Sequence, residues 1–277
     1  MIPASFDYRR VSSVKEAAKI LGGEEDAKLI AGGHSLLPLM RLRLARPSVL
    51  VDIARIEGLS YVRKDGKEFA IGALTRHHDV ANDAKLAADC PIVAYTAGQI
   101  GDPAVRHVGT IGGSVAHADP ASDLPTVLLA LGATFVVQGA KKERRIAAED
   151  FFRGLFTADL AQDEVLTEIR VPATGTQGWS YQKFRRRAQD WAVVGVAALT
   201  GNGHGPAVAL TNMADRPMRA AGVEAALAGG ADATTASARA AEGTSPASDA
   251  FASAEYRRDV AAVIVRRALE EAAGRRR

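Results

Sequence analysis

Short hydrophobic runs separated by glycine-rich or polar turns follow one another along the whole chain, and this pattern predicts a mixture of helices and strands. Residues 13–21 place apolar side chains at positions i, i+3, i+4 and i+7 behind a Ser13/Glu16 capping box, which predicts an amphipathic helix. Residues 28–31 predict a short buried strand and 49–53 a second strand, with a short helix over 35–44 between them. The first 53 residues therefore predict a βαββ unit with a glycine loop at a strand end, where α/β folds usually place ligands.

The rest of the chain predicts a second and a third unit. Lys64-Asp65-Gly66-Lys67 has the Asp-Gly signature of a hairpin turn. Thr174–Gly178 is the best candidate linker. Between the hairpin and the linker we expect helices at 75–80, 91–100 and 124–131, a helical turn closing at Phe151-Phe152, and strands at 134–137 and 165–171. After the linker we expect strands at 179–184, 193–200 and 207–211, a turn at Gly201-Asn202-Gly203, an alanine-rich helix pair and a last helix over 256–273.

Composition narrows the class of protein. Hydrophobic residues make up 47% of the 277 positions, and 35 basic against 32 acidic residues leave a net charge of only +3, which argues against nucleic-acid binding. Cys90 is the single cysteine, so neither an internal disulfide nor an iron–sulfur cluster held by this chain alone is expected. The N-terminus lacks a signal-peptide pattern and no apolar run is long enough for a membrane span, so we expect a cytoplasmic protein.

Two glycine stretches carry the strongest chemical signal, Leu29–Leu37 and Gly109–Asp123. Glycine pairs allow positive φ, and successive free N–H groups form nests that suit phosphate. We expect the second stretch to be neither a plain helix nor a buried strand. Neither matches the dinucleotide or P-loop fingerprint. A single glycine pair is more often a tight turn, but two pairs, each followed by serine, favour one nest per phosphate of the same cofactor.

Other polar residues leave alternatives open. Asp123 is either the N-cap of the helix that follows it or a ligand for sugar hydroxyls. His77-His78 are expected at the surface and its boundary, and no histidine has metal-ligand spacing. Lys183, Arg185 and Arg187 would alternate onto one face of a strand, either as a solvated edge or, with Trp191, near a redox ring. No nucleophile–base pair is evident, so we expect no catalytic residue and no metal site.

These stretches together resemble the FAD-binding (medium) subunit of the molybdenum hydroxylases, the carbon monoxide dehydrogenase and xanthine dehydrogenase group. The resemblance implies an α+β chain. It implies an FAD-binding domain of the PCMH type over residues 1–173, with subdomains of about 1–54 and 55–173. It also implies a C-terminal domain over 178–277 with a three-stranded antiparallel sheet and a helix bundle. The matching segments are Ala31–Pro38, Ile71–Thr75, Gln99–Asp102, Gly109–Ser114, Ala118–Pro125 and Leu166–Pro172.

The resemblance also implies the site and the function. This chain would carry FAD and pass electrons from the [2Fe–2S] clusters of a small subunit to an external acceptor, while a large subunit holds molybdopterin, in a dimer of heterotrimers. A stand-alone flavoprotein oxidoreductase, or a structural subunit that has lost FAD, are the alternatives. Ser114 departs from the asparagine that the family often has. The implied FAD-binding residues are Ala31, Gly32, Gly33, His34, Ser35, Leu36, Thr110, Gly112, Gly113, Ser114, Asp123, Lys183 and Trp191.

Overall fold

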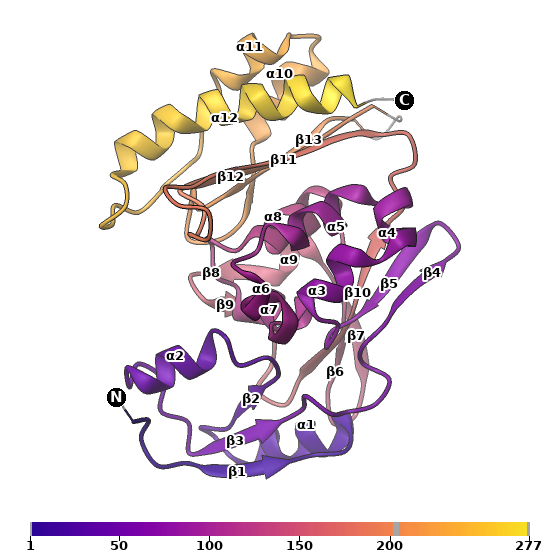
Figure 1. Ribbon diagram of the computed structural model, residues 1–277, viewed down its shortest axis with the longest axis vertical. Helices are drawn as coiled ribbons and strands as arrows, with labels where there is room; N and C mark the ends of the chain where they lie inside the picture. Colours follow the sequence, from indigo (N-terminus) through magenta and orange to yellow (C-terminus); the bar gives the residue numbers. More distant parts are fainter. Residues whose placement is uncertain (1, 202–204, 276–277) are drawn as a thin grey trace.

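Three larger β-sheets with their helices follow one another from the N-terminus to the C-terminus (Figure 1). The structure is a computed structural model and describes residues 2–201 and 205–275. A three-stranded sheet lies at one end, a five-stranded sheet with most of the short helices lies in the middle, and a four-stranded sheet under three helices lies at the other end. The turn expected at Gly201-Asn202-Gly203 falls mostly outside the described residues.

The first unit is a parallel sheet in the order β1-β3-β2, with α1 packed beside it. Ser13 caps α1 by accepting from the Glu16 N–H, as the capping box predicts. The expected buried strand at 28–31 is wrong in one respect, because β2 is a half-exposed edge strand and β3 is the buried centre. The elements are β1 (Asp7–Arg10), α1 (Val14–Gly23), β2 (Lys28–Ile30), α2 (Leu36–Arg41) and β3 (Val49–Asp52).

The second unit is an antiparallel sheet in the order β4-β5-β10-β6-β7. Asp65 pairs with Glu68, so Gly66-Lys67 form the hairpin turn that the sequence predicts. Its strands are β4 (Val62–Asp65), β5 (Glu68–Gly72), β6 (Thr134–Gln138), β7 (Glu143–Ala147) and β10 (Val165–Pro172), with a small hairpin of β8 (Phe152–Gly154) and β9 (Thr157–Ala158). Its helices are α3 (His77–Asn82), α4 (Ala84–Asp89), α5 (Pro91–Gly98), α6 (Pro103–Val108), α7 (Ile111–His117), α8 (Asp123–Ala130) and α9 (Ala148–Phe151).

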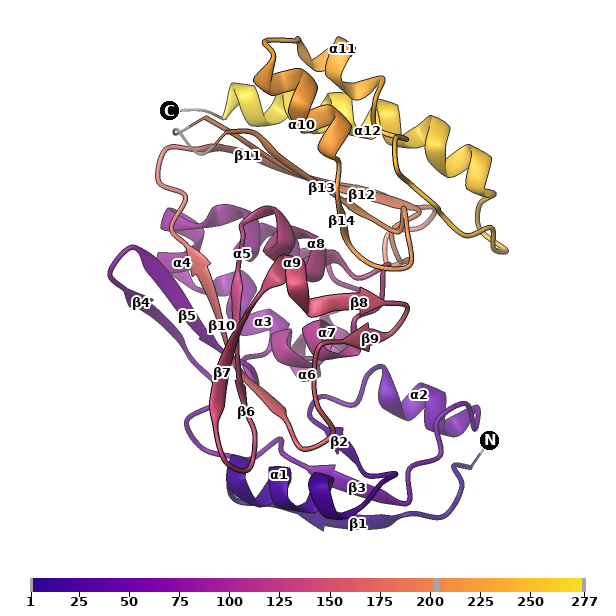
Figure 2. The same cartoon turned by 180° about the vertical axis from the view of Figure 1, so that it is seen from behind.

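The third unit corrects the expected three-stranded sheet, because the sheet has four strands in the order β11-β12-β13-β14. The added strand is short and pairs Met218 and Arg219 with the end of β13. The three helices of this unit cover the face of the four-stranded sheet that points away from the second unit (Figure 2). The elements are β11 (Gly178–Phe184), β12 (Val194–Thr200), β13 (Ala207–Thr211), β14 (Met218–Arg219), α10 (Ala221–Ala228), α11 (Ala233–Ser237) and α12 (Ala254–Gly274).

Strand β12 is buried on both faces and joins the second and third units. Successive side chains of a strand point to opposite faces. Val196 and Ala198 accordingly belong to the core under α12, whereas Ala197 and Leu199 belong to the large core that contains α5 and α8.

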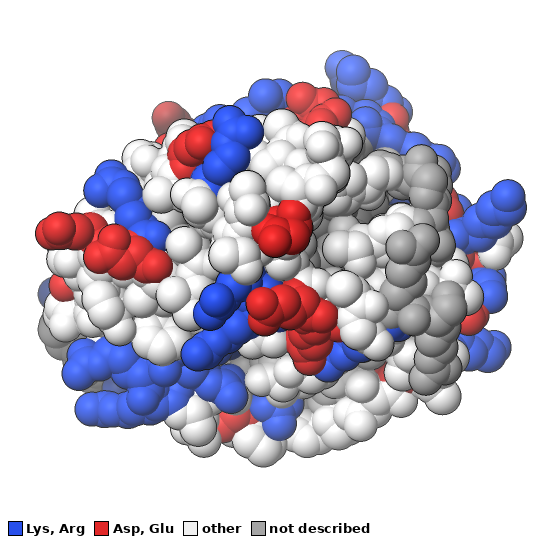
Figure 3. Space-filling view, turned by 90° about the horizontal axis from the view of Figure 1, so that it is seen from above, with Lys and Arg blue, Asp and Glu red and all other residues white. Residues whose placement is uncertain are grey.

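On the outer face of the helices, Lys and Arg are interspersed with Asp and Glu and gather most densely along one margin (Figure 3).

Candidate functional site

The first glycine stretch connects β2 to α2 and presents a row of free backbone donors. Gly33 has φ of +71°, the left-handed conformation that favours glycine. In the described part of the chain, no acceptor is recorded for the backbone N–H groups of residues 32–36. Ser35 stands at the N-cap position of α2, but its hydroxyl makes no capping bond. Successive free N–H groups of this kind bind anions, so the stretch retains the phosphate nest that the sequence predicts.

The second glycine stretch does not form the predicted nest, because its residues 111–117 form helix α7. Neither Gly112 nor Gly113 has a positive φ. Their N–H groups are already bonded, Gly112 to the Ala73 carbonyl at 2.9 Å and Gly113 to Thr110 Oγ1 at 3.1 Å. The helix forms because Thr110 caps it and because Gly112 lies against Ala73, the residue after β5, where a Cβ on Gly112 would come within 2.5 Å of Ala73 Cβ.

The two glycine stretches touch each other. A Cβ on Gly32 would lie 2.4 Å from the Val108 carbonyl oxygen and 2.8 Å from Gly109 Cα. This contact brings the free donors of the first stretch beside Thr110 and the start of α7. A ligand that lay on residues 32–36 would therefore lie against both stretches at once.

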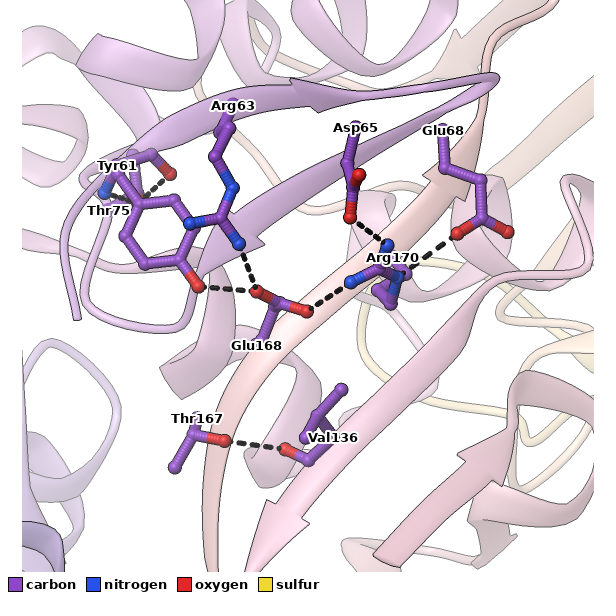
Figure 4. Close-up of polar contacts among 9 residues, drawn as sticks. All are labelled: Tyr61, Arg63, Asp65, Glu68, Thr75, Val136, Thr167, Glu168 and Arg170. Atoms are coloured by element: carbon purple, nitrogen blue, oxygen red, sulfur yellow. Dashed lines mark hydrogen bonds and ion pairs between the residues drawn. The ribbon is translucent and has the colours of Figure 1, made fainter. Parts of the chain in front are cut away.

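Residues 73–77 hold the second stretch in place. The Ile111 N–H donates to the Thr75 carbonyl and the His77 N–H to the Gly109 carbonyl, each at 3.0 Å. The Thr75 hydroxyl is fixed in turn by two 2.9 Å bonds with the Tyr61 backbone (Figure 4). Beside it, Glu168 accepts from the Tyr61 hydroxyl and pairs with Arg170, which anchors this end of the sheet.

His77 lies behind the contact between the stretches and is buried, not at the surface boundary as the sequence suggested. Its ring contacts Gly109 closely enough that a Cβ there would lie 2.9 Å from His77 Cδ2. Burial, together with the nearby His34, Arg106 and Arg76, lowers the pKa of His77 to about 4. Its Nδ1 is buried without a hydrogen-bond partner among the described residues. The imidazole is therefore neutral near pH 7.

Asp123 lies at the junction of the second and third units. Its Oδ1 accepts from the Tyr181 hydroxyl at 2.6 Å and its Oδ2 from Lys183 Nζ at 2.8 Å. Burial raises the pKa of Asp123, while Lys183 and Tyr181 oppose that rise. The N-cap alternative is wrong, because Ser122 occupies the cap position and Asp123 points across to β11.

Lys183, Arg185 and Arg187, which the sequence places on one face of a strand, do not share one strand in the structure. Strand β11 ends at Phe184, so the predicted alternation does not continue through Arg185 and Arg187. The Lys183 side chain is only 4% exposed, which excludes the solvated-edge interpretation for that residue. Its Nζ also donates to the Gln99 carbonyl at 3.3 Å.

Trp191 is 57% exposed and lies beside a cavity of about 290 Å³. Asp119 and Ala121, from the second glycine stretch, line this cavity together with Arg186 and Phe251. A larger and more open cavity of about 690 Å³ lies over α3, α5 and α6. The predicted residues thus fall in three places: the contact of the glycine stretches, the buried pair of Asp123 and Lys183, and Trp191 beside the smaller cavity.

Comparison with known proteins identifies the chain. The family model described as "FAD binding domain in molybdopterin dehydrogenase" matches residues 4–174, and "CO dehydrogenase flavoprotein C-terminal domain" matches 179–272. The chain therefore belongs to the family that these two models describe, the FAD-binding flavoprotein subunits of molybdopterin and CO dehydrogenases. The resemblance read from the sequence is therefore confirmed, and the chain is an oxidoreductase component with an FAD-binding domain.

Several relatives match over nearly the full length. The carbon monoxide dehydrogenase medium chain of Hydrogenophaga pseudoflava is 42% identical, and the match covers 98% of both chains. The glyceraldehyde dehydrogenase medium chain of Sulfolobus acidocaldarius is 38% identical over 99% of this chain and 100% of that one. A solved carbon monoxide dehydrogenase from H. pseudoflava superposes with a TM-score of 0.96 at 41% identity, covering 100% of both chains. Quinoline 2-oxidoreductase from Pseudomonas putida 86 superposes with a TM-score of 0.92 at 31% identity, again covering 100% of both.

Within residues 2–201 and 205–275, no group of three or more His, Cys, Asp and Glu side chains could hold a metal ion. None of the helices in the same ranges is long and apolar enough to cross a membrane.

Proposed function

We propose that this chain is the FAD-carrying electron-transfer subunit of a multi-subunit molybdenum hydroxylase. It takes electrons from the [2Fe–2S] clusters of a small subunit and passes them to an external acceptor, while a large subunit holds molybdopterin. The observation that carries the proposal is the contact of the two glycine stretches, with five free backbone donors on one side and Thr110 on the other. The full-length likeness to medium chains of carbon monoxide and glyceraldehyde dehydrogenases supports the same role.

The residues present fit FAD at this place. The free N–H groups of Gly32 to Leu36 suit its diphosphate, and Gly32 keeps the opposite stretch within contact distance. Gly113 is exposed and Ser114 half-buried on α7, so this side can also meet the ligand, although its N–H groups are not free. We propose as FAD-binding residues Ala31, Gly32, Gly33, His34, Ser35, Leu36, Thr110, Gly112, Gly113, Ser114, Asp123, Lys183 and Trp191.

Bound FAD would supply a flavin that accepts single electrons and releases one or two. The residues of this chain bind and orient that group and do no bond-making of their own. Lys183 contributes a buried positive charge balanced by Asp123, and Trp191 contributes an exposed aromatic face. We propose that both lie near the flavin ring, as the family resemblance implies.

The assembly and the domain boundaries belong to the same proposal. We expect a dimer of heterotrimers in the cytoplasm, with an FAD domain over 1–173, subdomains of about 1–54 and 55–173, and a C-terminal domain over 178–277. A stand-alone flavoprotein is less favoured because the full-length relatives are medium chains of larger enzymes. A subunit without FAD is less favoured because the row of free donors is intact.

Anaerobic mixing of the assembled enzyme with its oxidisable substrate tests the proposal. We expect the iron–sulfur absorption to bleach first and the oxidised flavin band to follow. Enzyme from which FAD has been removed should still reduce its iron–sulfur clusters but should no longer reduce an added acceptor. Unchanged acceptor reduction without FAD would contradict the proposed route.

A further inference from the structure

Arg76 lies where the two glycine stretches meet. It forms an isolated antiparallel bridge with Thr110, and directly paired residues of such a bridge have their side chains on the same side. Its guanidinium donates to the Val108 carbonyl, the same oxygen that lies against Gly32. A positive charge is thus fixed at the contact between the first stretch and the start of α7.

The guanidinium of Arg76 is not neutralised by the protein. Across residues 2–201 and 205–275, the Val108 carbonyl is its only recorded partner, and no carboxylate pairs with it. A guanidinium carries five N–H donors in a planar fork, so most of them are left for a ligand. Arg170, by contrast, is surrounded by Asp65, Glu68 and Glu168.

The groups near Arg76 are basic and not acidic. The pKa of the buried His77 is lowered first by burial and then by His34, Arg106 and Arg76, and no acidic group raises it. His34 of the first stretch, Arg106 of α6 and Arg76 itself therefore lie near one imidazole, and no carboxylate is among these neighbours. Such a locus favours an anion.

We propose that Arg76 binds the diphosphate of FAD as the charged partner of the neutral N–H row at Gly32–Leu36. This inference rests on the proposed function, because it takes FAD as the ligand. A planar guanidinium forms charge-assisted bonds with phosphate oxygens that backbone amides alone do not match in strength. Arg76 is therefore a specificity-determining residue for flavins that carry a diphosphate.

Binding of FAD and of riboflavin, which lacks both phosphates, separates this role from a structural one. The flavin-free full chain, alone and assembled with its partner subunits, is titrated with each flavin at several salt concentrations. The variants are Arg76→Gln and Arg76→Lys. Arg216→Gln is the matched control, because Arg216 also donates to one backbone carbonyl, that of Arg153, and lies on the surface of the third unit.

We expect Arg76→Gln to weaken FAD binding by about tenfold or more, the effect of losing a hydrogen bond to a charged group, and to leave riboflavin affinity unchanged. The salt dependence of FAD binding should become shallower, Arg76→Lys should recover part of the loss, and Arg216→Gln should behave as wild type. Equal losses for FAD and riboflavin would mean that Arg76 only holds Val108, and undiminished FAD affinity would mean that it has no role; either result overturns the inference. Wild-type protein that binds FAD no better than riboflavin would overturn it too, whereas wild-type protein that binds neither would overturn the proposed function itself.

Discussion

Replacing Gly32 with alanine tests whether the two glycine stretches must touch. The added Cβ would lie 2.4 Å from the Val108 carbonyl oxygen and 2.8 Å from Gly109 Cα, and both are backbone atoms that cannot rotate away. Ordinary van der Waals contact begins at 3.4 Å, so the stretches would have to separate by about 1 Å. Overpacking of this kind costs about 1–3 kcal/mol in folding free energy.

The same displacement should reduce FAD affinity. It moves the donor row of the first stretch away from Thr110 and strains the bond between Arg76 and the Val108 carbonyl. We expect the dissociation constant for FAD to rise at least about tenfold, or ~1.4 kcal/mol. The melting temperature of the flavin-free protein should fall by roughly 2–4 °C for each kcal/mol lost.

Thermal unfolding and FAD titration of Gly32→Ala measure both effects. Gly23→Ala is the matched control, because Gly23 ends helix α1 and a Cβ there meets nothing within 4 Å. The control should bind FAD as wild type does. If Gly32→Ala matched the control in both stability and FAD affinity, the contact between the stretches would have no role in binding.

Three further predictions concern the buried pair of Asp123 and Lys183 and two residues at this contact, His77 and Thr110. Asp123→Asn should destabilise the protein by about 3–5 kcal/mol in chemical unfolding, since it leaves Lys183 buried without its partner, and adding Lys183→Met should recover part of the loss. The free energy of unfolding should fall by up to ~1.4 kcal/mol per pH unit between about pH 6.5 and about pH 4, because His77 is protonated in the unfolded chain and stays neutral when buried in the folded one. Melting of His77→Gln at a series of pH values should show a shallower fall. Thr110→Val should cost about 1 kcal/mol of stability, measured by melting, by removing the cap on the Gly113 N–H.

Each of these has a contradicting result. If the double variant at Asp123 and Lys183 were as unstable as Asp123→Asn, the loss of stability would not come from leaving Lys183 buried without a partner. An unchanged pH profile in His77→Gln would assign the acid sensitivity to other groups. A Thr110→Val variant of wild-type stability would mean that the close packing of Gly112 alone holds the start of α7.

The sequence predicted those elements whose cause is local. The Ser13/Glu16 box set the start of α1, and the Asp-Gly turn set the hairpin of β4 and β5. It failed for α7 because glycine has low helix propensity, so Gly112-Gly113 read as a loop. The structure forms a helix there through contacts with residues far away in sequence, chiefly Ala73 and the carbonyl of Thr75.

The candidate site was only partly predictable for the same reason. The glycine residues of the site could be predicted from the local sequence alone, and Gly33 has the positive φ that a phosphate nest requires. The pairing of Asp123 with Lys183 joins residues 60 positions apart, and no local pattern records it. Arg76 and His77 were missed as site residues because they adjoin the glycine contact only in the folded chain; their nearest sequence signal was the segment Ile71–Thr75 that precedes them.

The flavin content of the purified, assembled protein tests the central claim most directly. The account predicts a yellow protein with a stoichiometric amount of FAD for wild type and for Gly23→Ala, and little or none for Gly33→Val, whose left-handed backbone and tight contact with Leu37 leave no room for a branched side chain. A colourless wild-type protein that takes up no FAD at high excess would contradict the account. Equal FAD content in wild type and Gly33→Val would contradict the place that it assigns to the cofactor.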